Sequence, residues 1–157
     1  MRFTKNISIV SGIVLCVLAL ASPATAAPTP AEVSLLQAMN QARAQNGVRP
    51  LRIDYRLEAA ARAKSRLMLR TGTFAHGNFT RRLSSYRARG PYFGENLAWG
   101  VGSSGSAAGI VQMWLASPSH RANLLRRSFQ RVGLGIYVGT FRGYGGATVA
   151  TANFAGR

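Results

Sequence analysis

Residues 114–125 read Trp-Leu-Ala-Ser-Pro-Ser-His-Arg-Ala-Asn-Leu-Leu and predict the end of one helix followed by the start of another. Pro118 has no N–H group to donate, so a first helical turn tolerates it. Ser119 is expected to cap a short helix over 121–125. His120 would lie at the start of that helix, where the helix dipole disfavours an imidazolium cation. A neutral imidazole can bind a metal or accept a proton, although a histidine here also serves simply to satisfy backbone groups.

Residues 1–26 have the pattern of a secretory signal peptide. A basic start precedes a mostly apolar run over 7–20, and Ala-Thr-Ala at 24–26 suits a signal peptidase. The apolar run is too short for a membrane span. We therefore expect a secreted, periplasmic or extracellular protein with no transmembrane segment after cleavage. In it, residues 27–34 form a linker and helix start, and residues 35–154 form one domain.

The mature chain is expected to be strongly basic and free of cysteine. The one cysteine, Cys16, lies in the leader, so a packed core and not a disulfide must stabilise the domain, which we expect to be a monomer. Arg2 and Lys5 also lie in the leader and are two of the 20 basic residues, which leaves 18 against four acidic ones. This charge predicts attraction to anionic polymers, membranes or nucleic acid. We expect anionic envelope polymers as partners and no specific nucleic-acid partner. The arginines are spread along the chain, however, and equally suit a solvated surface.

Hydrophobic periodicity predicts helices first and strands last. Helices are expected over 30–46, 55–70, 80–89 and 107–116, and strands over 93–100, 132–138 and 147–154. Thr29 and Glu32 form a capping box for the first helix, and Asp54 caps the second. The glycine-rich residues 139–146 are expected to form a hairpin loop between the last two strands. This order favours an α+β domain over alternating α/β units.

Glu95 is the acidic residue that helix capping does not explain. It lies between Gly94 and the apolar run 97–99, where an unpaired carboxylate costs several kcal/mol. Backbone N–H groups, an arginine, a histidine or a metal are the partners open to it. We expect both histidines, His76 and His120, to converge on Glu95, because two histidines and one glutamate suffice to hold Zn²⁺ with an open fourth position. The alternative is that Glu95 satisfies backbone donors while the histidines line a pocket.

Three segments together resemble the CAP superfamily, which comprises the cysteine-rich secretory, antigen 5 and pathogenesis-related 1 proteins. They are Phe74-Ala75-His76, Gly94-Glu95-Asn96-Leu97-Ala98-Trp99-Gly100 and residues 114–125, and the cysteine-free bacterial branch is the most similar. The resemblance implies an α+β fold, a three-layer α-β-α sandwich with a small antiparallel sheet between helices. It also implies a cleft at His76, Glu95 and His120 that in some members binds a divalent metal.

The cleft departs from that of eukaryotic members at Ser117. A second cleft glutamate commonly stands at this position, so the present chain has one negative charge fewer. A neutral serine is also a weak ligand. The expectation that His76, Glu95 and His120 bind Zn²⁺ or another divalent cation loses support, as does any mechanism that needs two carboxylates.

Three functions fit these observations. The preferred one is a non-enzymatic extracellular binding module for a lipid, a sterol-like molecule, another small ligand or a protein. A metal-dependent hydrolase would use the same cleft, with metal-bound water as the nucleophile and Glu95 as a ligand or general base. A basic envelope-associated protein would bind anionic polymers with a steep salt dependence. Gly133 and Gly135 are not followed by a predicted helix, which argues against a nucleotide-binding loop.

Overall fold

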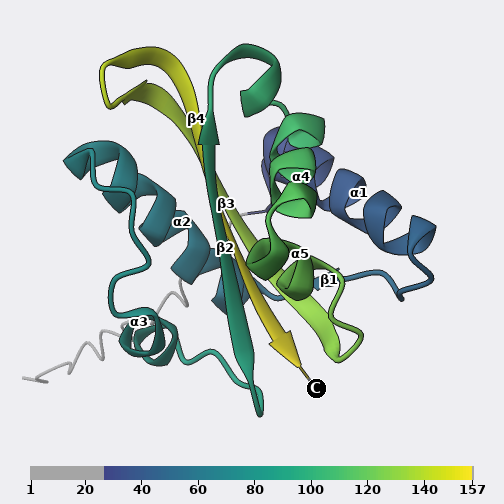
Figure 1. Ribbon diagram of the computed structural model, residues 1–157. Helices are drawn as coiled ribbons and strands as arrows, with labels where there is room; N and C mark the ends of the chain where they lie inside the picture. Colours follow the sequence, from purple (N-terminus) through teal and green to yellow (C-terminus); the bar gives the residue numbers. More distant parts are fainter. Residues whose placement is uncertain (1–26, 157) are drawn as a thin grey trace, which may run out of the picture.

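The computed structural model describes residues 27–156, and the expected signal peptide lies outside the described residues. At its centre is a four-stranded sheet with the strand order β1-β3-β4-β2 (Figure 1). The strands are β1 (Arg52–Ile53), β2 (Phe93–Gly100), β3 (Phe129–Phe141) and β4 (Tyr144–Gly156). The sheet is antiparallel apart from β1, which pairs in parallel with β3. Two residues are too few to reveal a strand by alternation, and the sequence therefore does not predict β1.

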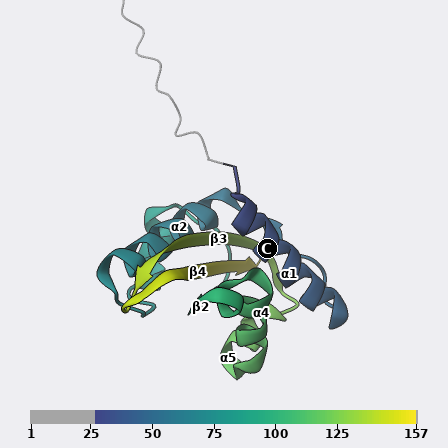
Figure 2. The ribbon, with the colours of Figure 1, turned by 90° about the horizontal axis from the view of Figure 1, so that it is seen from above.

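Helices cover both faces of the sheet and form the predicted α-β-α sandwich. On one side lie α2 (Tyr55–Thr71) and α3 (Phe79–Ser85), and on the other lie α1 (Pro30–Gln45), α4 (Ala107–Ala116) and α5 (Pro118–Leu124) (Figures 1 and 2). A 3₁₀ helix, η1 (Gly102–Gly105), precedes α4. Over residues 27–156, no helix combines the length and the apolar character that crossing a membrane requires.

The predicted starts of the first two helices are confirmed. The Thr29 hydroxyl accepts a hydrogen bond from the N–H of Glu32, and the Glu32 carboxylate accepts one from the N–H of Thr29, so the capping box closes both ways. Asp54 accepts from the N–H groups of Arg56 and Leu57 at the start of α2. Each such cap stabilises its helix by about 1 kcal/mol.

The predicted start of α5 is wrong by a few residues. The helix begins at Pro118, and Ser117 is its N-cap residue, so Ser119 lies inside the helix and does not cap it. The fixed φ of proline suits the first helical position, which explains the earlier start. As a consequence His120 is the third residue of the helix and not the first, as a cap at Ser119 would make it, and Ser117 makes no side-chain capping bond.

Backbone turns at two arginines change other predicted boundaries. Arg87 has a φ of 53°, and α3 accordingly ends at Ser85, well before its predicted end. Arg142 and Gly143, with φ of 52° and 87°, form a two-residue turn, so the loop predicted over 139–146 is wrong and β3 and β4 extend into it. Positive φ at both central residues is typical of a type I′ hairpin, whose twist matches that of the strands.

Two glycines of β3 allow α2 to lie directly on the sheet. A Cβ atom at Gly133 would be 1.9 Å from the backbone nitrogen of Glu58, and one at Gly135 would be 2.4 Å from the carbonyl carbon of Ala61. Any side chain at either position would therefore clash with the backbone of α2. These glycines serve close packing and lie within a strand, not at a phosphate-binding loop.

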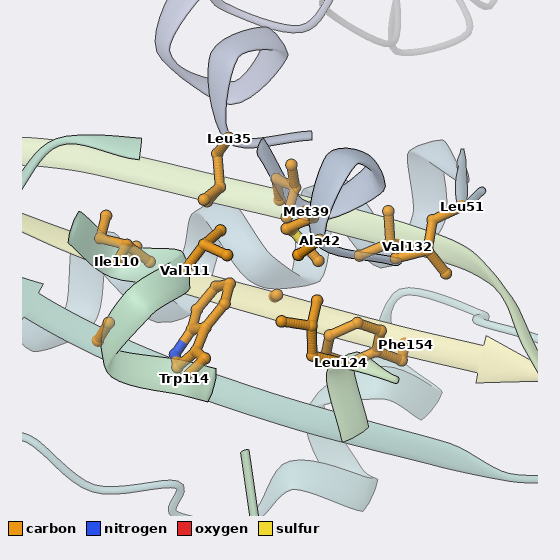
Figure 3. Packing of buried hydrophobic residues seen from close by; sticks show 14 of the residues in the cluster. Leu35, Met39, Ala42, Leu51, Ile110, Val111, Trp114, Leu124, Val132 and Phe154 are labelled. Carbon is orange, nitrogen blue, oxygen red and sulfur yellow. The ribbon is translucent and has the colours of Figure 1, made fainter. Parts of the chain in front are cut away.

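The largest apolar cluster fills the space between the sheet and α1, α4 and α5 (Figure 3). Trp114 of α4, Leu35 and Met39 of α1, and Phe154 of β4 are all buried there. Burial of side chains of this size stabilises the fold by about 1.5–3 kcal/mol each before chain entropy is counted. The indole nitrogen of Trp114 also donates to the carbonyl of Leu97 at 3.0 Å, which attaches α4 to β2.

Candidate functional site

The candidate site lies along β2, which forms one edge of the sheet. The loop between α2 and α3 carries His76, which contacts Glu95 of this edge strand. Helix α5 carries His120 and packs against β2. Glu95 belongs to β2 itself. Three segments that are far apart in the sequence therefore meet at one sheet edge.

Glu95 is buried between two basic side chains. One carboxylate oxygen lies 2.8 Å from Nδ1 of His76, and the other accepts a hydrogen bond from the Arg82 guanidinium in an ion pair. The Glu95 side chain is only 2% exposed. Of the four kinds of partner that the sequence leaves open, the structure contains a histidine and an arginine. The charge of Arg82 and the hydrogen bonds from both groups offset the cost of burying the carboxylate.

Arg82 is a site residue that the sequence analysis does not single out. It lies in α3, is largely buried, and donates a second hydrogen bond to the His76 carbonyl at 3.1 Å. It thereby attaches the His76 loop to Glu95. No sequence signal distinguishes Arg82 from its neighbour Arg81, because both belong to the same basic segment and only the direction of the helix face separates them.

Lys64 of α2 is a second unpredicted basic group in this region. It is buried, and burial lowers the pKa of its ammonium group; Arg82 lowers it further, whereas Glu95 opposes the shift. The surroundings of Glu95 thus hold one carboxylate and the basic side chains of His76, Arg82 and Lys64. Basic side chains outnumber the single carboxylate, so the site is electropositive.

His120 is positioned by two asparagines. The side chain of Asn96 in β2 donates to the His120 carbonyl at 2.9 Å, and Asn123 of α5 donates to the side-chain oxygen of Asn96 at 3.0 Å. Burial and, to a smaller degree, the neighbouring His76 lower the pKa of His120. The predicted neutral imidazole is thus supported, with burial as the main cause. Asn96 within an apolar strand is a signal comparable to Glu95, since a buried amide also requires partners.

A cavity of about 290 Å³ lies beside these residues. Its lining is mainly apolar and consists of Phe74, Leu97, Ala98, Trp99, Met113, Trp114, Ser117 and His120. Ser117 and His120, both predicted as cleft residues, are its polar members. His76 and Glu95 are adjacent to the cavity through Phe74 and β2 but do not line it. The predicted cleft therefore divides into an apolar cavity and an electropositive cluster around Glu95.

The donors of this cluster do not form a three-ligand metal shell. Among residues 27–156, no three His, Cys, Asp or Glu side chains are grouped so that they could hold a metal ion. Both oxygens of Glu95 are engaged, and positive charge on Arg82 and Lys64 would repel a cation. His76 and His120 remain as nitrogen donors. Zinc binding by the three predicted residues stays a prediction.

Comparison with known proteins identifies the family. The family model described as CAP, the cysteine-rich secretory protein family, matches residues 36–154. The protein YkwD of Bacillus subtilis (strain 168) is 32% identical over 109 residues, which cover 66% of this chain and 41% of YkwD. The chain thus spans less than half the length of this relative.

Solved structures show the same fold. An extracellular protein containing an SCP domain from Bacillus anthracis str. Ames matches with a TM-score of 0.68 and 24% identity, over 84% of this chain and 45% of that one. An outer surface protein of Borrelia burgdorferi matches with a TM-score of 0.64 and 23% identity, over 78% of this chain and 90% of that one. The predicted resemblance and fold are confirmed, and the chain belongs to the CAP family of cysteine-rich secretory proteins.

Proposed function

We propose that this domain is a secreted, non-enzymatic binding module whose cavity beside β2 takes the apolar part of a small ligand, such as an acyl segment of a lipid. The observation that carries the proposal is the cavity lining, in which aromatic and aliphatic side chains surround Ser117 and His120. Pockets of this composition, with a few placed polar groups, are typical of small-molecule sites.

The size of the cavity favours a narrow ligand. Drug-sized molecules occupy pockets of about 300–1,000 Å³, and the cavity of about 290 Å³ lies at the lower end of that range. An acyl segment suits this volume better than a whole sterol-like molecule. The Ser117 hydroxyl makes no capping bond, and His120 is biased toward the neutral form, so both are available to a polar head group at the rim.

The arrangement of Glu95 speaks against the hydrolase alternative. A general base must lie within hydrogen-bond reach of the attacking water. The Glu95 oxygens instead contact His76 and Arg82, and Glu95 does not line the cavity. Glu32, Asp54 and Glu58, the other acidic side chains, pair with arginines and do not line the cavity.

Secretion is part of the proposal. Residues 1–26 have the composition of a signal peptide. The fold neighbours described above are called extracellular or outer-surface proteins, which agrees with export. Expression with the native N-terminus and mass spectrometry of the secreted protein would test this; a mature N-terminus at Ala27 is expected, and retention of residues 1–26 would contradict it.

Tryptophan fluorescence provides a direct test of the cavity. The chain has two tryptophans, Trp99 and Trp114, and both line the cavity. A brominated alkyl maltoside below its micellar concentration should quench their emission in a saturable manner, because bromine quenches only at short range. The quenching should persist in excess chelator, since the proposed binding needs no metal.

Ser117→Phe is the blocking variant, because it fills the cavity rim without removing a hydrogen bond. Ser119→Phe is its matched control, since it adds the same side chain at an exposed α5 position outside the cavity. In Ser117→Phe, the maltoside concentration that gives half-maximal quenching should rise at least tenfold. In Ser119→Phe it should change little. Equal quenching in both variants, or its loss on chelation, would overturn the proposal.

A further inference from the structure

The four acidic side chains of this protein are all withdrawn from its surface. Glu32, Glu58 and Glu95 are buried, and Asp54 is mostly covered and paired with Arg131. Glu32 and Glu58 share the guanidinium of Arg62. No Asp or Glu side chain therefore remains exposed to offset the arginines, and the charge that the sequence spreads along the chain becomes a surface charge of one sign.

A second cavity concentrates this charge at the β1 end of the sheet. Its volume is about 390 Å³, and its lining consists of Arg49, Pro50, Arg52, Ile53, Gln130 and Arg131. Three of the six lining residues are arginines. The cavity lies across the junction of β1 and β3, on the opposite sheet edge from β2 and the candidate site.

Two of these arginines have no counter-charge. Arg131 is satisfied by Asp54 and by the carbonyls of Arg89 and Gly156. Within residues 27–156, the guanidinium groups of Arg49 and Arg52 have neither a hydrogen-bond nor an ion-pair partner. Arg52 is moreover the register neighbour of Arg131, and like charges at paired positions repel unless an anion lies between them.

Further arginines lie on the segment after α5, which is attached to the segment that carries Arg49. The buried Arg43 side chain donates to the carbonyls of Arg49, Leu124, Arg126 and Phe129 and so holds the segment after α5 beside the segment after α1. Arg126 and Arg127 are exposed on that segment. An anionic group in the cavity would thus be followed by additional positive charge along the surface, which suits a polymer better than an isolated ion.

We propose that this cavity binds a phosphate group of a phosphodiester polymer that carries no bases and has a small polyol as its repeat unit. Guanidinium groups bind phosphate oxygens in a fork geometry, and Arg49 and Arg52 are the two that are free to do so. Pro50 and Ile53 give an apolar wall for the carbon backbone of the repeat. Single-stranded nucleic acid needs aromatic platforms for its bases, and the lining has none.

Fluorescence anisotropy with a labelled, synthetic poly(glycerol phosphate) oligomer tests this site. The variant Arg49→Gln/Arg52→Gln should bind the oligomer at least tenfold more weakly than the wild type at about 100 mM salt. The slope of log K against log salt should fall in magnitude by about 2, one for each lost phosphate contact. Both side chains are exposed and unpartnered, so the urea midpoint of the variant should equal that of the wild type.

The matched control is Arg70→Gln/Arg81→Gln, which removes the same charge from exposed positions outside the cavity. It should weaken binding less than threefold. Equal losses in the two double variants would overturn the site and leave only diffuse surface charge. Equally tight binding of polyglutamate would overturn the assignment of a phosphate ligand. Tighter binding of an oligothymidylate of the same charge would overturn the assignment of a polymer without bases.

Discussion

Nδ1 of His76 lies 2.8 Å from a carboxylate oxygen of Glu95, although the His76 side chain is 55% exposed and that of Glu95 only 2%. An exposed ring is thus oriented by a buried charge. The contact occupies Nδ1 and leaves Nε2 as the nitrogen that faces away from Glu95. Because Arg82 engages the second Glu95 oxygen, the orientation of His76 depends on a pair of contacts from two different elements.

Removal of Arg82 should destabilise the fold strongly. The variant Arg82→Ala leaves the Glu95 carboxylate buried with one partner fewer, and breaking a buried ion pair costs about 3–5 kcal/mol. Urea denaturation should show a loss of about 3 kcal/mol, allowing for residual access of water to Arg82. Arg81→Ala, at an exposed position of the same helix, should change the free energy of unfolding by less than about 0.5 kcal/mol. Similar losses in the two variants would contradict the role assigned to Arg82.

The stability of the domain should fall in mild acid because of His120. Burial lowers the pKa of His120 below its ordinary value of about 6.5, so near that pH the unfolded chain binds more protons than the folded one. This contribution is fully present above the unfolded-state pKa and is lost as the pH falls toward the folded-state pKa. Urea midpoints between about pH 8 and pH 5 should drop more for the wild type than for His120→Gln. Parallel curves would show that His120 does not cause the effect.

Metal affinity should increase when Arg82 is neutralised. Arg82→Gln frees one Glu95 oxygen and removes a positive charge beside His76. Calorimetric titration with Zn²⁺ should then give about tenfold tighter binding or more than in the wild type, whereas Arg81→Gln should have no effect. Loss of binding in both His76→Ala and His120→Ala would identify a shared metal site. No heat of binding in any variant would exclude the zinc prediction and with it the metal-dependent hydrolase.

Gly133 should tolerate no side chain. The Cβ of Gly133→Ala would lie 1.9 Å from the backbone nitrogen of Glu58 and 2.0 Å from the carbonyl carbon of Leu57, so α2 must move off the sheet. We expect a loss of about 3 kcal/mol or more, or failure to fold. Gly145→Ala is the control, because nothing lies within 4 Å of its added Cβ and its φ is not positive. A thermal midpoint for Gly133→Ala close to that of Gly145→Ala would contradict the close packing of α2.

Short-range chemistry explains why much of the fold is predictable from the sequence. Thr29, Glu32 and Asp54 cap helices through residues two or three positions away, and the structure contains those bonds. The strand over 93–100 is predicted with its observed bounds, because a glycine lies near each end of its apolar run. Where prediction failed, the signal was ambiguous: the glycines over 139–146 suggested a loop, but only Arg142 and Gly143 form the turn.

The sequence by itself determined the starts and caps of α1 and α2, the α+β order of elements, the excess of basic residues, and the need of Glu95 for a partner. Tertiary structure alone decided that the partner is Arg82 and not Arg81, and that the two unpaired arginines, Arg49 and Arg52, share one cavity. Caps and periodicity act over a few residues, so they can be read along the chain. Ion pairs and cavities join segments whose approach depends on how α2 and α5 pack on the sheet, and no local pattern encodes that geometry.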